Sequence, residues 1–243
     1  MADISEGLRE IHKIFHEDFV IPESLQTPSR NDSPEFLAHM LFVRALASVL
    51  YVREVLDVFS AISKVEPHAN TSVLYARALA ELAAVTYYLR KNVRDAFRSS
   101  KLDIALEWTH KGFSGNRYLK NFMTPDSPEF KDMPKPPDLN FVDPIDIAKA
   151  TKCYSNEVLR EEQERQDYEF LSEIAHPNSG AINHHFHLDF KNRRIYFSRN
   201  PNDEDKWDGY IVKYAASVGS EIVELIRLAK EIDPSLNEPT SAE

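Results

Sequence analysis

The sequence predicts a mainly α-helical fold, a bundle of about five to six helices with a small two-stranded β-hairpin near the C-terminal end. Glycine is scarce, with 6 residues in a chain of 243, whereas leucine, alanine, glutamate and arginine are frequent, a composition that favours helices. Apolar residues recur at helical spacing over long stretches. Proline preceded by serine or aspartate stands where two of these stretches begin, as at many helix starts.

Residues 1–32 are predicted to form an N-terminal helix and a connector. The helix is expected over about residues 4–18, and its apolar side chains Leu8, Ile11, Ile14 and Phe15 share one face. A segment that contains proline and serine follows from Pro22 to Asp32 and is expected to link this helix to the rest of the chain.

Residues 33–233 are predicted to form the main helical domain. Ser33, Pro34 and Glu35 supply an N-cap, a proline at the first helical position and an acid in the first turn. The helix that they start is expected to run to about residue 63. Two more helices are expected over about 70–99 and 101–111.

The second half of the domain is interrupted by a proline-rich excursion at 123–143, which neither a helix nor a central strand would tolerate. Asp143 and Pro144 are expected to start a long helix that ends before Pro177. Alternating polar and apolar residues predict the hairpin at 184–199. A last helix is expected over about 206–231, and a disordered tail over 234–243.

Charge and cysteine content limit the function classes. The formal net charge of −10 makes the surface as a whole a poor match for a polyanion. A single cysteine, Cys153, excludes an intramolecular disulfide framework and a zinc site built from several thiolates. Arg44 and Arg53 interrupt the longest apolar stretch, and no secretion signal is recognisable. We therefore expect a cytoplasmic protein that does not associate with membranes.

The predicted helix 34–63 carries a charge on its apolar stripe. At about 100° per residue, Arg44 falls beside Leu37, Tyr51, Val55 and Ile62. The opposite, solvent-facing side is assigned to His39, Arg53, Glu54 and Asp57. A guanidinium on an apolar stripe is expected to be paired or to reach an anion, because burying it alone is very costly.

Arg77 and Glu81 form the first half of the candidate site. They share a stripe of the predicted helix 70–99 with Ala84 and Tyr88. One interpretation is a structural ion pair between residues four apart on a helix. The other is a carboxylate that orients a functional arginine, and the sequence leaves both open.

Ser172, Glu173 and His176 form the second half, where a polar helix is stopped by Pro177. A histidine can donate, accept or transfer a proton near neutral pH, and a neighbouring carboxylate can fix its tautomer. The alternative is that His176 caps its own helix C-terminus. A serine hydrolase is not favoured, because side chains four apart on one helix rarely give nucleophile–base geometry.

A metal site is a weaker alternative. His185 and His187 lie two residues apart on a predicted strand, with Asp189 next in line, and two or three imidazoles would suit zinc or a similar ion. The solvent face of a two-stranded ribbon shows the same alternation. The sequence has no glycine-rich phosphate loop, no His-Glu-x-x-His and no Gly-x-Ser-x-Gly, and we expect no cofactor.

The pattern Leu171-Ser172-Glu173-x-x-His176-Pro177, preceded by Arg77-x-x-x-Glu81, resembles a family of uncharacterised, mainly bacterial helical proteins. That family is itself distantly similar to the HEPN superfamily of helical nucleotide-binding proteins and ribonucleases of toxin–antitoxin and phage-defence systems. The resemblance implies a helical fold. HEPN ribonucleases separate arginine and histidine by four to six residues, however, whereas ten residues separate Arg165 from His176 here.

Three functional hypotheses follow. In the first, an HEPN-like protein binds or cleaves RNA or a nucleotide as a homodimer, with a catalytic group of Arg77, Glu81, Ser172, Glu173 and His176. In the second, the protein is a non-catalytic helical interaction protein that contacts a partner protein, and a buried arginine, glutamate and histidine network fixes helix register. In the third, a metal-dependent hydrolase uses the histidine cluster.

Overall fold

The computed structural model describes the helical body of the chain. The described residues are 6–22, 25, 28–62, 69–113, 145–159, 168–172, 187–189, 194–196 and 204–237. The predicted excursion at 123–143 lies outside them.

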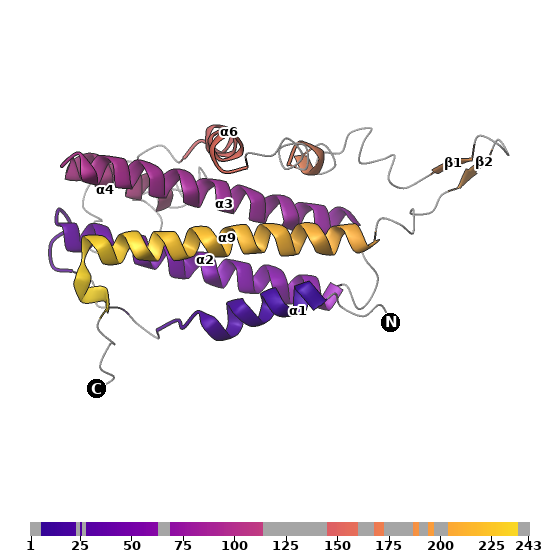
Figure 1. Ribbon diagram of the computed structural model, residues 1–243, viewed down its shortest axis with the longest axis horizontal. Coiled ribbons are helices and arrows are strands. Elements are labelled where there is room, and N and C mark those ends of the chain that lie inside the picture. The colour runs from indigo at the N-terminus through magenta and orange to yellow at the C-terminus, as the bar shows by residue number, and fades with distance from the viewer. Residues whose placement is uncertain are drawn as a thin grey trace, which may run out of the picture.

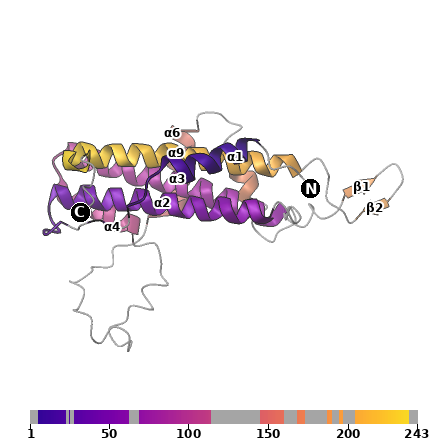
Figure 2. The same cartoon turned by 90° about the horizontal axis from the view of Figure 1, so that it is seen from below.

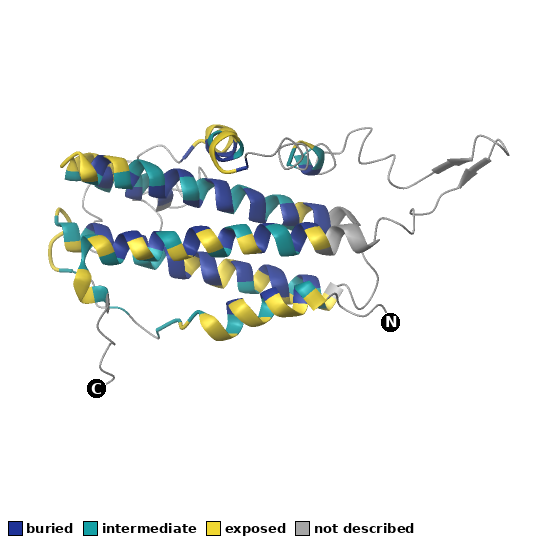
Figure 3. Ribbon diagram, in the orientation of Figure 1, coloured by how far each residue is buried: buried dark blue, intermediate teal, exposed yellow. Residues whose placement is uncertain are grey.

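Three long helices form the centre of the fold: α2 (Pro34–Ile62), α3 (Ala69–Arg98) and α9 (Glu204–Ile232). They run side by side, and α9 packs along both α2 and α3, which touch each other only slightly (Figures 1 and 2). Their buried faces turn toward one another (Figure 3), where Leu41, Leu79 and Leu225 are fully inaccessible to solvent. The predicted mainly helical class is confirmed.

Two shorter helices pack on this centre. Helix α4 (Leu102–Phe113) lies against α3 and also contacts α2. Gly112 permits the close approach of α4 to α3, because a Cβ at this position would lie 2.8 Å from a methyl group of Leu89. Helix α6 (Ile147–Glu157) packs on α3, and its axis crosses the long helices (Figure 1).

The N-terminal segment also belongs to the bundle. Helix α1 (Glu6–Lys13) continues into a π-helical turn, η1 (Ile14–Asp18), and both lie near α2 and α9. Leu8, Ile11 and Phe15 are buried as predicted, but Ile14 is 36% exposed. The prediction for Ile14 was therefore wrong, because the wider π turn begins at this residue and changes which side chains face the core.

The start of α2 follows the predicted capping pattern. The Ser33 hydroxyl accepts a hydrogen bond from the Phe36 backbone N–H at 3.2 Å, which satisfies one of the free donors of the first turn. The Pro34–Ala61 stretch of α2 is also the one helix among the described residues that meets the length and hydropathy criteria for crossing a membrane. Half of this apolar window is buried inside the bundle.

The predicted continuous helix from Pro144 to Pro177 was wrong. The Asp146 side chain caps α6 by accepting a bond from the Lys149 N–H, and the helix ends at Glu157. The N–H groups of Val158 and Leu159 both bond to the Tyr154 carbonyl, and the Leu159 side chain is buried. Burial of Leu159 therefore accompanies the end of the helix. A further helical stretch covers residues 168–172.

Two three-residue strands, β1 (His187–Asp189) and β2 (Arg194–Tyr196), pair antiparallel with Leu188 opposite Ile195. The rest of the predicted hairpin at 184–199 lies outside the described residues, and the hairpin as a whole remains a prediction. The chain continues from α9 into a 3-10 helix, η4 (Pro234–Asn237), within the segment for which disorder was predicted.

Candidate functional site

Arg77 and Glu81 form the ion pair that the sequence predicts. The Arg77 Nε donates to a Glu81 carboxylate oxygen at 2.8 Å, and both side chains are about one-quarter exposed, at 26% and 24%. The pair lies within one helix and is partly open to solvent. This geometry allows the structural interpretation and the oriented-arginine interpretation alike.

Residues close in sequence to Glu81 and to Ser172 share the lining of one cavity. A small cavity is lined by side chains from α3, α6, α9 and the helical stretch 168–172: Ala80, Ala84, Tyr154, Leu159, Tyr168 and Tyr214. Leu171 is fully buried, and Ser172 is partly buried. Tyr168 therefore lies near the turn of α3 that contains Glu81, whereas neither Ser172 nor Glu81 lines the cavity. Glu173 and His176 lie outside the described residues.

Arg44 does not obtain the partner that its position on an apolar stripe predicts. Its Nε is inaccessible to solvent and has no hydrogen-bond partner among the residues that the structure describes. Burial lowers the pKa of this guanidinium.

A buried pair that the sequence analysis did not single out joins α3 to α9. Two nitrogens of Arg90 donate to one carboxylate oxygen of Glu221, at 3.0 and 2.8 Å, and the side chains are only 10% and 7% exposed. Burial raises the pKa of Glu221, and the charge of Arg90 opposes that shift. The signal was present, because Glu221 shares an apolar stripe of α9 with Val218, Ile222 and Leu225.

A second group missed by the sequence analysis connects α3 to α6 around Glu157. Its carboxylate accepts hydrogen bonds from the Tyr87 hydroxyl at 2.6 Å and the Lys91 ammonium at 2.5 Å. These donors and the Cys153 thiol, 3.3 Å away, lower the pKa of Glu157 to about 2. Burial and the Glu157 carboxylate raise the pKa of Cys153, which disfavours the thiolate that nucleophilic catalysis requires.

The structure places potential metal ligands away from the predicted cluster. The side chains of His185 and His187 lie outside the description. The described residues His12, His16 and Asp57 do place one ligand atom each within 4.8 Å of one another.

The predicted solvent face of α2 was wrong for His39. This residue is only 7% exposed, because it packs into the bundle.

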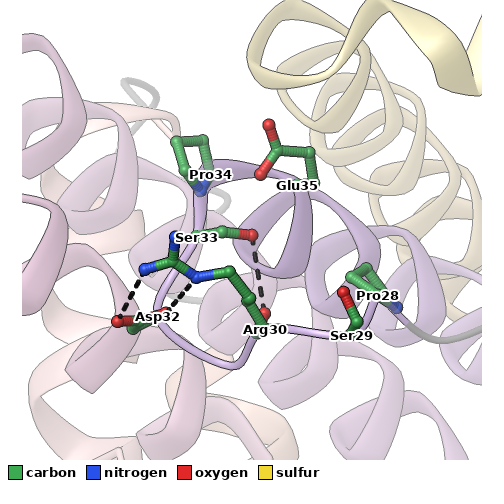
Figure 4. Close-up of a pocket in the computed structure, with 7 residues that line it drawn as sticks. All are labelled: Pro28, Ser29, Arg30, Asp32, Ser33, Pro34 and Glu35. Atoms are coloured by element: carbon green, nitrogen blue, oxygen red, sulfur yellow. Dashed lines mark hydrogen bonds and ion pairs between the residues drawn. The ribbon is translucent and has the colours of Figure 1, made fainter.

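A hollow at the start of α2 is lined by residues 28–30 and 32–35 (Figure 4). Arg30 and Asp32 form an exposed ion pair across it, with Nε and Oδ1 3.2 Å apart. Asp32 and Glu35 place two carboxylates beside the helix N-terminus, which opposes the binding of an anion there.

Comparison of the chain with protein-family models, curated proteins and solved structures finds no match.

Proposed function

We propose that the protein is a non-catalytic helical interaction protein that pairs with a second copy of itself. We also propose that the protein is cytoplasmic and that residues 184–199 form a β-hairpin. The observation that carries it is a mixed apolar and charged surface, the α2–α3 face, made up of Tyr51, Leu74, Arg77 and Glu81.

The members of the α2–α3 face are close together and accessible. Leu74, Arg77 and Glu81 follow one another at helical spacing along α3. Glu81 is near enough to Tyr51 of α2 to contribute to the raised pKa of this phenol, for which burial is the larger cause. Tyr51 is 43% exposed and Leu74 is 53% exposed. Tyrosine and arginine are enriched at protein interfaces, and the exposed Leu74 side chain adds apolar area to this face.

The charges of this face favour a second copy as the partner. A twofold axis brings the same surface patch of both subunits together. If one residue of the first subunit contacts a different residue of the second, the reverse contact also forms. A face with a cation and an anion one helical turn apart can then place Arg77 of each copy next to Glu81 of the other. The face is therefore complementary to itself, although the chain carries a net charge of −10.

Sedimentation equilibrium of the full chain tests this proposal. We expect the wild type to be a dimer, Arg77→Glu and Tyr51→Ser to be monomers, and the exchanged variant Arg77→Glu/Glu81→Arg to be a dimer again. Val223→Ser, which removes an exposed apolar side chain of α9, serves as the matched control and should stay a dimer. A monomeric wild type, or a dimeric Arg77→Glu variant, would contradict the proposal.

A second candidate function is an HEPN-like protein that binds or cleaves RNA or a nucleotide. The cavity that Tyr168 shares with Ala80 and Ala84 of α3 favours it, because it places the start of the stretch 168–172 near the turn that contains Glu81. Growth of cells that express the chain tests this function. Wild type should slow growth, His176→Ala should relieve the effect, and His110→Ala should not. Equal growth with wild type and His176→Ala would exclude a toxic ribonuclease.

A further inference from the structure

Two histidines of the N-terminal segment converge on one carboxylate of α2. His12 lies in α1 and His16 in η1, and their Nε2 atoms lie 2.8 and 3.2 Å from the same Oδ1 of Asp57. The two imidazole rings are stacked, with centroids 4.2 Å apart and planes inclined by 17°. Both rings therefore present a nitrogen on the same side, toward α2.

The backbone that carries His16 is held by the helix that carries Asp57. Arg53, one turn before Asp57 on α2, donates from Nε to the Phe15 carbonyl at 2.8 Å and from a terminal nitrogen to the Phe19 carbonyl at 2.6 Å. These carbonyls lie in and just after the π-helical turn. Arg53 thus fixes the turn against α2, and Asp57 meets the histidines one turn further along.

His12 and Asp57 are joined by a hydrogen bond between Nε2 and Oδ1, whereas the His16 Nε2 has none among the described residues. The His16 Nε2 is shielded from solvent and makes no hydrogen bond with any residue that the structure describes, although Asp57 Oδ1 is 3.2 Å away. A neutral Nε2 can face a carboxylate with its lone pair, and a cation between the two acceptors would remove the repulsion.

We propose that His12, His16 and Asp57 bind a divalent transition-metal ion such as Zn²⁺. Two imidazole nitrogens and one carboxylate oxygen form a donor set that zinc uses, and three protein ligands leave one coordination position for water. Zinc–ligand bonds of about 2.0–2.1 Å in a tetrahedron separate the ligand atoms by about 3.3 Å. The two Nε2–Oδ1 distances, 2.8 and 3.2 Å, are about 0.5 and 0.1 Å shorter than this value, and the three ligand atoms lie within 4.8 Å of one another.

The ion would connect two parts of the fold that are distant in the sequence. It would tie the N-terminal segment to α2, next to the backbone contacts of Arg53. This site is separate from the α2–α3 face, so the result of a metal-binding experiment does not depend on self-association.

Titration of chelator-treated protein with ZnCl₂ by calorimetry tests the site, and the visible absorption of bound Co²⁺ reports its geometry. We expect one ion per chain for the wild type, with tetrahedral Co²⁺ bands. His12→Ala, His16→Ala and Asp57→Ala should each weaken binding by at least about tenfold. Zn²⁺ should raise the melting temperature of the wild type but not that of Asp57→Ala.

Two variants serve as matched controls. Glu54→Ala removes an exposed acid three residues before Asp57, and His110→Ala removes a histidine of α4. Both should bind zinc like the wild type, and circular dichroism of the ligand variants without metal should show an intact helical fold. Absence of stoichiometric binding by the wild type, or unchanged affinity in Asp57→Ala, would overturn the proposal.

Discussion

Helix α3 carries two arginine–glutamate pairs that differ in sequence separation and in burial. Arg77 and Glu81 are four residues apart on one helix and about one-quarter exposed. Arg90 and Glu221 are 131 residues apart, join α3 to α9, and are at most 10% exposed. The same two residue types therefore form a local surface pair at one level of α3 and a buried contact between helices at another.

The difference shows which pair the fold depends on. A buried charge without its partner is far more costly than an exposed one, because little water is present to solvate it. At Arg77 and Glu81 solvent can replace a lost partner, so this pair is available for a role at the surface. The Arg90–Glu221 pair is part of the packing between α3 and α9.

The largest effect is expected from breaking the buried pair. Arg90→Met should lower the free energy of unfolding by about 3–5 kcal/mol, because it leaves the Glu221 carboxylate buried and unpaired. The double variant Arg90→Met/Glu221→Leu should recover most of this loss, since neither charge remains. Urea denaturation measures both. A double variant as unstable as the single one would show that packing, and not the lone charge, causes the loss.

The local pair could be predicted from the sequence, whereas the buried pair was missed. Arg77 and Glu81 are neighbours on any α-helix, and the apolar spacing predicts that helix to within one residue of its bounds. The partner of Arg90 depends on how α3 and α9 pack, which helical periodicity does not specify. Glu221 on an apolar stripe marked a buried charge without identifying its partner.

Two local features also had no clear signal in the sequence. Neither glycine nor proline marks the end of α6 at Glu157. Its end coincides with burial of Leu159, which depends on contacts with other helices. The π-helical turn that positions His16 likewise has no residue signature comparable to a helix cap. The Glu173 and His176 part of the candidate site remains a prediction.

A smaller effect is expected at Glu157, a third and more exposed pairing along α3. The pKa of this carboxyl is lowered from 4.5 to about 2 by Lys91, Tyr87 and Cys153. A lowered folded-state pKa stabilises the fold above pH 4.5, and this contribution is lost as the pH falls toward 2. Solvent weakens the effect, because the side chain is 41% exposed.

Urea denaturation at several pH values between 5 and 2 checks this prediction. The wild type should lose more stability across this range than Glu157→Gln, which lacks the titrating group. Glu107→Gln is the matched control, because it removes the carboxylate of another surface lysine–glutamate pair. Parallel pH profiles for the wild type and Glu157→Gln would contradict the role assigned to Glu157.

The smallest effect is expected at Arg77 and Glu81. Glu81→Gln should change the free energy of unfolding by less than about 1 kcal/mol, because a partly exposed pair within one helix contributes little. Thermal unfolding at a protein concentration where the chain is monomeric separates this effect from association. A loss as large as that of Arg90→Met would mean that the two pairs play the same role.

Double-mutant cycles on the two pairs test the contrast most directly. Each cycle compares the free energies of unfolding of the wild type, two single variants and the double variant, and yields the coupling energy of the pair. We predict a coupling of at least about 3 kcal/mol for Arg90 and Glu221, and only about 0.2–0.5 kcal/mol for Arg77 and Glu81. Equal couplings, or a stronger coupling between Arg77 and Glu81, would contradict the division between a buried structural pair and a surface pair.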